Sequence, residues 1–115
     1  MNDSIALEKA IKFALRIVAL YKYLTETKHE YVLSKQILHS GGHIAKHVKT
    51  ALHSHRGFSV EMAKALEKAL ETELWLLLLK EVEFISETQF DSLNFDCVEM
   101  IKLTSSISKT SRTNE

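Results

Sequence analysis

Proline is absent from this 115-residue chain, and glycine occurs only three times, at Gly41, Gly42 and Gly57. Both residues interrupt regular secondary structure, so a chain with so few of them favours long, unbroken elements. Apolar residues recur at three- and four-residue steps along most of the sequence, which is the period of helices rather than strands. At this length we expect one all-α domain with a single modest core.

Cysteine is almost absent too, because Cys97 is the only one. A lone cysteine excludes an intrachain disulfide and favours a reducing compartment. Long hydrophobic runs are missing. The longest, Leu74 to Leu79, is far shorter than the roughly 20 residues that span a bilayer. The N-terminal residues lack the basic-then-apolar order of a signal peptide. We therefore expect a cytoplasmic protein without a membrane partner.

The chain has no excess of either charge, since 15 Lys and Arg balance 15 Asp and Glu. This balance is unlike that of a strongly basic nucleic-acid binder. The charges are nevertheless segregated. The segment 32–60 contains four basic residues and five histidines but no acid, whereas 61–99 contains ten acids and three lysines. We expect a basic and an acidic helix face to meet, either within one bundle or between copies of the chain.

The apolar period and the polar interruptions predict four helices, from Asp3 or Ser4 to about 25–27, then over 30–52, 59–86 and 89–106. Short connections between them predict an antiparallel up-down-up-down four-helix bundle over residues 1–106. The Ser- and Thr-rich residues 107–115 are predicted to form a polar, disordered tail.

The glycines and one serine lead to three further predictions about where helices continue and how they end or begin. Gly41-Gly42 either breaks the second helix or lets another helix come close, and we favour a continuous helix because Ile44 and Val48 resume the earlier apolar phase. Gly57 suits a left-handed exit from that helix. Ser59 suits the N-cap of the third helix.

The first and third helices have wider apolar arcs than a helix with one packing partner needs. We therefore expect part of each arc to lie between copies of the chain. The residues predicted at this interface are Phe13, Leu20, Leu66, Leu70, Glu73 and Leu77.

Three local patterns occur in a fixed order. They are Leu33-Ser34-Lys35-Gln36-Ile37-Leu38 followed by Ser40-Gly41 and Ile44, then Phe58 about a dozen residues before a Glu-Thr-Glu, and then Glu71-Thr72-Glu73-Leu74-Trp75-Leu76-Leu77. Together they resemble the bacterial four-helix-bundle family named after proteins encoded in intervening sequences of 23S ribosomal RNA. That family is related to the Avd-like accessory proteins of diversity-generating retroelements.

The resemblance implies a four-helix bundle that assembles as a homopentamer and has no catalytic activity or cofactor. The retroelement relatives bind nucleic acid and associate with a reverse transcriptase. The polar side of the second helix departs from the family pattern. His39 stands where the family has Arg, His43 and His47 replace small polar residues and an Asn, and Thr50 stands where Glu is frequent.

The second helix is also where binding chemistry is predicted. Seven basic or histidine side chains are candidates for contacts with nucleic-acid phosphates. They are Lys35, His39, His43, Lys46, His47, Lys49 and Arg56.

Histidines four residues apart lie about 6 Å apart along a helix, so His43 and His47 are weak candidates to share one metal ion. The ends of the His39–His43–His47 series are about 12 Å apart, so a complete site needs a ligand from another helix or copy.

Catalytic constellations are missing. Glu71 and Glu73 point about 200° apart on a helix and do not share a substrate. Cys97 lies on an apolar side, where packing is the expected role. The sequence therefore favours a non-enzymatic homo-oligomeric module, associated with a ribonucleoprotein or a reverse transcriptase. Nucleic-acid binding by the second helix is the alternative, and a histidine metal site the third hypothesis.

Overall fold

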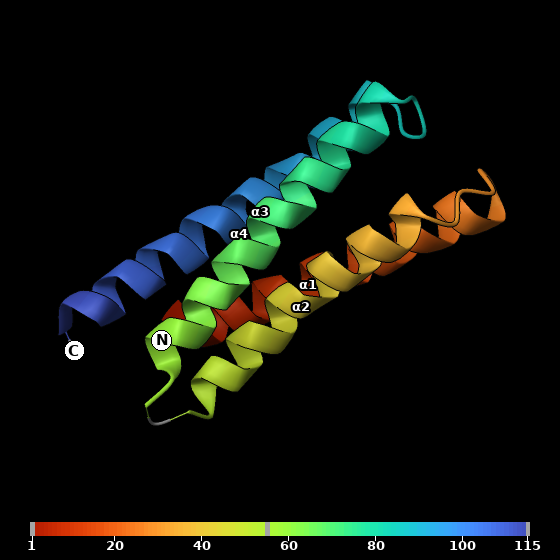
Figure 1. Ribbon diagram of the computed structural model, residues 1–115. Coiled ribbons are helices and arrows are strands. Elements are labelled where there is room, and N and C mark those ends of the chain that lie inside the picture. Colours follow the sequence, from red (N-terminus) through yellow and green to blue (C-terminus); the bar gives the residue numbers. More distant parts are fainter. Residues whose placement is uncertain (1, 55, 115) are drawn as a thin grey trace.

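Four helices account for nearly all of the computed structural model, which describes residues 2–54 and 56–114. They are α1 (Asn2–Glu26), α2 (Leu33–Leu52), α3 (Phe58–Glu81) and α4 (Glu87–Asn114), and no strand occurs in the described ranges. Each helix packs on the next, and α4 returns to contact α1, although more loosely than the other pairs. Successive helices run in opposite directions (Figure 1). The predicted antiparallel four-helix bundle is confirmed.

The last helix is longer than its polar composition suggested. It continues to Asn114 instead of ending near Ser106, so residues 107–114 are helical where a disordered tail was predicted, and Glu115 of that tail lies outside the described residues. Packing explains the difference. Ile107 packs against the core, and the buried Ser108 donates a hydrogen bond from Oγ to the carbonyl of Ser59 at 3.5 Å.

The helix ends also differ from the expected caps. Gly57 is the N-cap of α3 with φ −104°, so it makes no left-handed exit, and Ser59 lies buried inside the first turn. At the start of α2, the Glu30 carboxylate accepts hydrogen bonds from the N–H groups of Val32, Leu33 and Ser34 at 3.1, 2.9 and 2.7 Å. Burial raises the pKa of Glu30, but these backbone donors outweigh it, and the pKa lies below its ordinary value.

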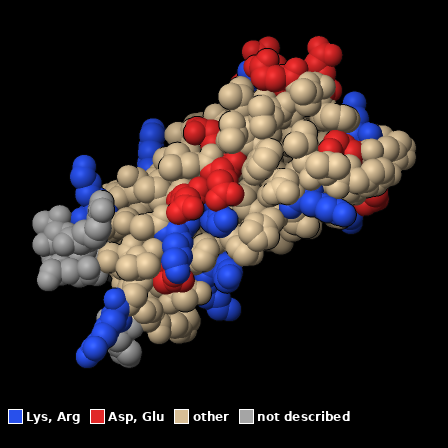
Figure 2. Space-filling model, in the orientation of Figure 1, with Lys and Arg blue, Asp and Glu red and all other residues tan. Residues whose placement is uncertain are grey.

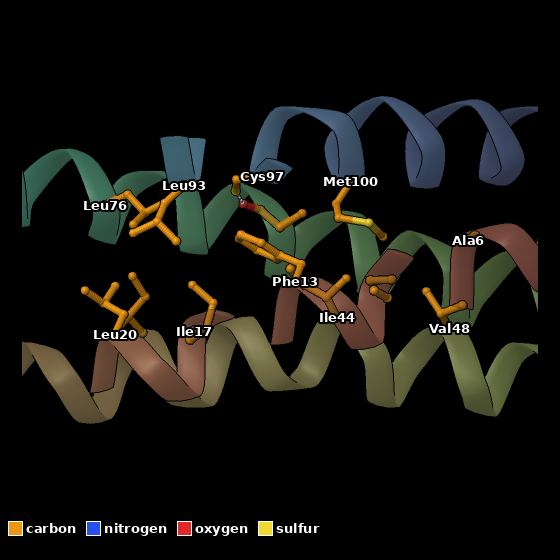
Figure 3. Close-up of a cluster of buried hydrophobic side chains, with 14 of the residues drawn as sticks. Ala6, Phe13, Ile17, Leu20, Ile44, Val48, Leu76, Leu93, Cys97 and Met100 are labelled. Carbon is orange, nitrogen blue, oxygen red and sulfur yellow. Dashed lines mark hydrogen bonds between the residues drawn. The ribbon is translucent and has the colours of Figure 1, made fainter. Parts of the chain in front are cut away.

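The core runs along the axis of the bundle, and all four helices contribute to it (Figure 3). Phe13 and Leu20 are part of it, with exposed fractions of 2% and 6%. Their predicted place at an interface between copies therefore needs correction, because a side chain enclosed by its own bundle has almost no surface left for another chain. The surplus apolar surface of α1 lies elsewhere on that helix.

The Gly41-Gly42 pair lies in the middle of an unbroken α2, as expected, but the two glycines have different surroundings. A Cβ atom added at Gly41 lies 2.9 Å from Cγ1 and from Cγ2 of Ile17 on α1. A Cβ atom added at Gly42 meets nothing within 4 Å. Only Gly41 is therefore needed for the close approach of α1 and α2.

This difference predicts opposite effects of alanine. Gly42→Ala should raise the free energy of unfolding by about 1 kcal/mol, because alanine has the better helix propensity and the space is open. Gly41→Ala should leave the free energy of unfolding unchanged or lower it. Overpacking against the branched, buried Ile17 costs about 1–3 kcal/mol, which cancels or exceeds the gain in helix propensity. Urea unfolding of both variants measures the difference. Equal stabilities would show that α1 does not press on Gly41.

Candidate functional site: exposed faces and a histidine seam

A row of leucines on α3 remains exposed in the single chain. We call Leu70, Leu74, Leu77 and Leu78 the α3 face, and their exposed fractions are 48%, 51%, 40% and 37%. Two of the predicted interface residues, Leu70 and Leu77, belong to it. Leu66 and Glu73 are half-buried beside it. The side of the molecule drawn in Figure 2 has broad uncharged areas, with acidic side chains gathered at the end where α3 joins α4.

A second apolar row lies on α1. We call Ile11, Leu15 and Val18 the α1 face, and their exposed fractions are 46%, 63% and 43%. The predicted interface of α1 contained Phe13 and Leu20 but not the exposed Leu15. The four- and three-residue steps between positions 11, 15 and 18 could have revealed this face. They place three apolar residues on a side of the helix that the core does not need.

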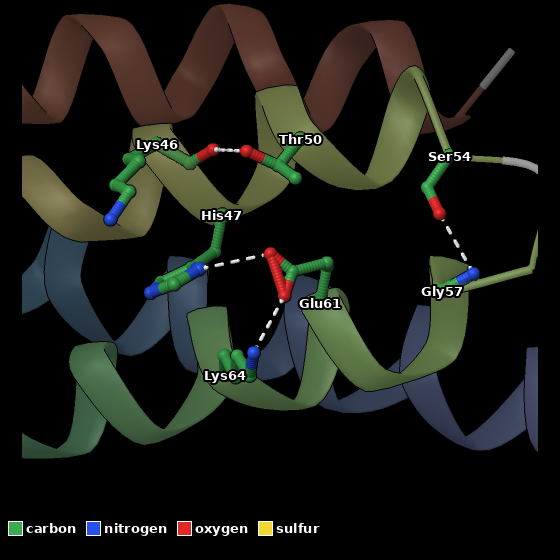
Figure 4. A network of polar contacts seen from close by, with 7 residues as sticks. All are labelled: Lys46, His47, Thr50, Ser54, Gly57, Glu61 and Lys64. Atoms are coloured by element: carbon green, nitrogen blue, oxygen red, sulfur yellow. Dashed lines mark hydrogen bonds and ion pairs between the residues drawn. The ribbon is translucent and has the colours of Figure 1, made fainter.

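Polar side chains of α2 and α3 meet along one seam of the bundle. His47 Nδ1 lies 3.4 Å from Glu61 Oε1, and Lys64 Nζ lies 3.0 Å from Glu61 Oε2 (Figure 4). The hydrogen bond from Lys64, and then that from His47, hold the pKa of Glu61 below its ordinary value although burial opposes them. Glu61 therefore stays ionised and joins the two helices.

The rings of the three α2 histidines follow one another along this seam, tilted for His39 and His43 and nearly edge to face for His43 and His47. Ring centroids are 3.9 Å apart for His39 and His43, and 5.9 Å apart for His43 and His47. Burial lowers the pKa of His43 below 6.5, and the charges of His39, Lys46, His47 and Lys68 lower it further. His43 is therefore neutral at pH 7, and its protonation is resisted by every charged neighbour that acts on it.

The pKa of His43 predicts how stability changes with pH. The unfolded chain, with an ordinary histidine pKa of about 6.5, binds this proton more readily than the folded chain. The stability is therefore complete above the unfolded pKa and declines as the pH falls through it. Urea unfolding at about pH 7.5 and about pH 5.5 should show this loss, and His43→Gln should reduce it. If His43→Gln lost as much stability as the wild type between these two pH values, the loss would come from other titrating groups.

The geometry gives little support to the predicted histidine metal site. No group of three metal-ligating side chains occurs in the part of the chain that the structure describes. His47 already directs Nδ1 at Glu61, and the His43 and His47 rings stand nearly edge to face at 81°.

The predicted nucleic-acid contacts divide into two groups. Lys35, Lys46, Lys49 and His39 are exposed on α2, and Arg56 is exposed in the following loop. His43 and His47 instead turn toward α3 and are half-buried. Lys46 and Lys49 line a shallow surface depression. The polar residues Thr50, His53 and Ser54 line it with them.

None of the described helices combines the length and the hydropathy that a membrane-spanning segment requires. The family model of the 23S rRNA-intervening sequence proteins matches residues 2–106. The chain belongs to this family. No match was found among curated proteins.

A solved structure supports the same assignment. It is the crystal structure of a protein from Bacteroides thetaiotaomicron VPI-5482, described as a protein with unknown function from the S23 ribosomal protein family. The two chains share 42% identity with a TM-score of 0.91, over 95% of this chain and 99% of that one. The resemblance to the intervening-sequence family is thus confirmed over nearly the whole bundle.

Proposed function

We propose that this member of the 23S rRNA-intervening sequence family is a non-enzymatic, homo-oligomeric interaction module. The observation that carries the proposal is the pair of exposed apolar rows on α1 and α3. Large apolar patches on a soluble domain mark binding surfaces. The family resemblance gives five copies as the expected number. An accessory role beside a ribonucleoprotein or a reverse transcriptase fits a module that binds other macromolecules and does not catalyse a reaction.

The placement of the reactive residues supports a role without catalysis. Glu71 pairs with Lys68 at 3.1 Å, whereas the charge of Glu73 acts on Cys97 of α4, so the two carboxylates serve different sides of α3. Cys97 is buried, and its thiol pKa is raised. A thiol in that environment is a poor nucleophile.

Sedimentation equilibrium at micromolar concentration tests the proposal. We expect a mass that is a multiple of the 13.1 kDa chain, with five copies as the specific expectation. The mass should depend little on salt, because the exposed rows are apolar. A stable monomer would contradict the proposal.

Nucleic-acid binding is a second candidate, favoured by the exposed lysines on α2 and the absence of any acid from that helix. Since the solved relative is assigned to a ribosomal protein family, RNA is the first nucleic acid to test. Binding should be strongest at low salt, because contacts between lysines and phosphates weaken as the salt concentration rises.

The test compares two double variants. Lys46→Glu with Lys49→Glu should weaken RNA binding and lower the slope of log K against log salt by about 0.7–0.9 for each lost phosphate contact. The matched control is Lys28→Glu with Lys102→Glu, which changes exposed lysines outside α2 and should leave the slope unchanged. Absence of binding at low salt would exclude this candidate.

A further inference from the structure

A crevice runs between α1 and α4. These two helices are in contact, but more loosely than the other neighbouring pairs of the bundle. Two depressions lie along the crevice, with volumes of about 470 Å³ and about 240 Å³. Leu20 and Leu93 line the larger depression, and Phe13 and Met100 line the smaller one (Figure 3). Side chains of the core therefore form part of the lining of both depressions.

The two depressions are spaced like residues on one side of a helix. Phe13 and Leu20 are seven residues apart on α1, and Leu93 and Met100 are seven residues apart on α4. Seven residues correspond to about 10.5 Å along a helix axis. An amphipathic helix that binds in a groove presents apolar side chains at positions i and i+7. A helix lying along the crevice would place one such side chain over each depression.

Ion pairs cross the crevice between the two depressions and beside them. Lys9 and Arg16 of α1 reach carboxylates of α4, with distances of 2.8 Å to Glu99 and 2.8 Å to Asp96. Arg16 also donates hydrogen bonds to the carbonyl oxygen and to Oγ of Ser92. The four charged side chains remain between 35% and 42% exposed. They are therefore accessible to the charges of a bound partner.

The rims of the crevice determine which charges such a partner needs. At the smaller depression, Lys9 and Lys12 make the α1 rim basic, and Asp96 and Glu99 make the α4 rim acidic. Glu8 pairs with Lys12 at 3.5 Å but does not line the depression. A helix with acidic residues along one edge of its apolar row and basic residues along the other places unlike charges on both rims. A helix with one charge on both edges meets a rim of its own sign.

We propose that the α1–α4 crevice binds an amphipathic helix of a partner protein. This helix has apolar residues seven positions apart and small residues between them, where the Arg16–Asp96 pair crosses the crevice. Its acidic edge lies along α1 and its basic edge along α4. The proposal rests on the proposed role as an interaction module and adds the surface and the kind of partner. No residue of the α1 face or the α3 face lines the two depressions.

Three designed peptides test the proposal. Each is a stapled helix with two leucines seven positions apart and alanines between them. The first carries Glu along one edge of this row and Lys along the other, the second carries Glu along both edges, and the third carries Lys along both. We expect the first to bind, and the other two to bind about tenfold more weakly at low ionic strength, because like charges then meet at one rim. Fluorescence anisotropy of the labelled peptides measures the three affinities.

A pair of matched variants locates the binding site. Ala19 is exposed and lines the larger depression, so Ala19→Phe fills the space of one leucine anchor. It should weaken binding of the first peptide by about tenfold or more. Ala63 is an exposed alanine of α3 outside the crevice, and Ala63→Phe should leave the affinity unchanged. Circular dichroism of both variants shows that the bundle is intact.

Charge variants give a second test that does not depend on filling the depression. Arg16→Gln with Asp96→Asn removes both charges of one pair, so the affinities of the three peptides should become more alike. Lys68→Gln with Glu71→Gln is the control, because it removes an ion pair within α3 that lies outside the crevice. It should leave the difference among the peptides as large as in the wild type.

The outcomes separate this proposal from the homo-oligomer. Absence of binding of the first peptide, equal binding of all three, or binding that Ala19→Phe leaves intact overturns the crevice as the site. An unchanged preference after removal of the Arg16–Asp96 charges overturns the role of the rims. Sedimentation decides the oligomeric state independently. A monomer that binds the first peptide overturns only the homo-oligomer, and an oligomer that does not bind it overturns only the crevice.

Discussion

Replacement of Phe13 by alanine is expected to lower the free energy of unfolding by about 3–5 kcal/mol. Phe13 is among the largest fully enclosed side chains and lies in the centre of the four-helix core (Figure 3). Its removal loses the transfer free energy of the ring and leaves a cavity that surrounding helices fill only in part. Chemical unfolding followed by circular dichroism measures the loss.

Ile5→Ala is the matched control for this prediction. Ile5 is on the same helix and 47% exposed, so its truncation should change the stability by no more than about 0.5 kcal/mol. Both unfolding curves should keep the same denaturant dependence. If Phe13→Ala lowered the free energy of unfolding by less than about 1 kcal/mol, Phe13 would not lie in the core.

The sequence predicted the helices and most of the core because both depend on a short-range period. Ile37, Ile44 and Val48 follow the three- and four-residue steps, and all three are fully buried. Continuity of α2 through Gly41 followed from the same phase. The spacing did not reveal which glycine is constrained, since that depends on Ile17 of another helix.

The errors have one common cause. An apolar arc shows how much surface a helix can bury, but only the packing of neighbours shows which part remains exposed. Phe13 and Leu20 were therefore predicted at an interface although they lie in the core, and the exposure of Leu15 was not predicted. The end of α4 was misjudged in the same way, because the contact of Ser108 with Ser59 joins segments far apart in the sequence.

The histidine row was recognised from its spacing, but its environment was not. The exposed Lys46 and Lys49 can be inferred from α2 alone, whereas the partners of His43 and His47 come from α3. Glu61 and Lys68 lie opposite them only once the helices are paired. Two of the seven residues predicted to contact nucleic acid, His43 and His47, thus belong to a seam that holds the bundle together.

Labelling of Cys97 is expected to be at least about a thousandfold slower in the folded protein than in the unfolded chain at pH 8. Burial, followed by the negative charge of Glu73, raises the pKa of the Cys97 thiol to about 12. An ordinary thiol with a pKa of about 8.5 is partly ionised at this pH, so the reactive thiolate is depleted more than a thousandfold by the pKa alone. The Sγ atom also faces inward, 3.4 Å from the carbonyl oxygen of Ala69.

Because Cys97 is the only cysteine, iodoacetamide labelling followed by mass spectrometry has a single possible target. A completely buried thiol reacts through opening of the bundle, so its labelling rate reports the open population when closing is fast. Phe13→Ala should then speed native labelling by about two to three and a half powers of ten, the equivalent of its 3–5 kcal/mol. Similar rates in folded and unfolded protein would show that α3 and α4 do not enclose Cys97. A Phe13→Ala variant with unchanged labelling would show that the core around the two residues does not open as one unit.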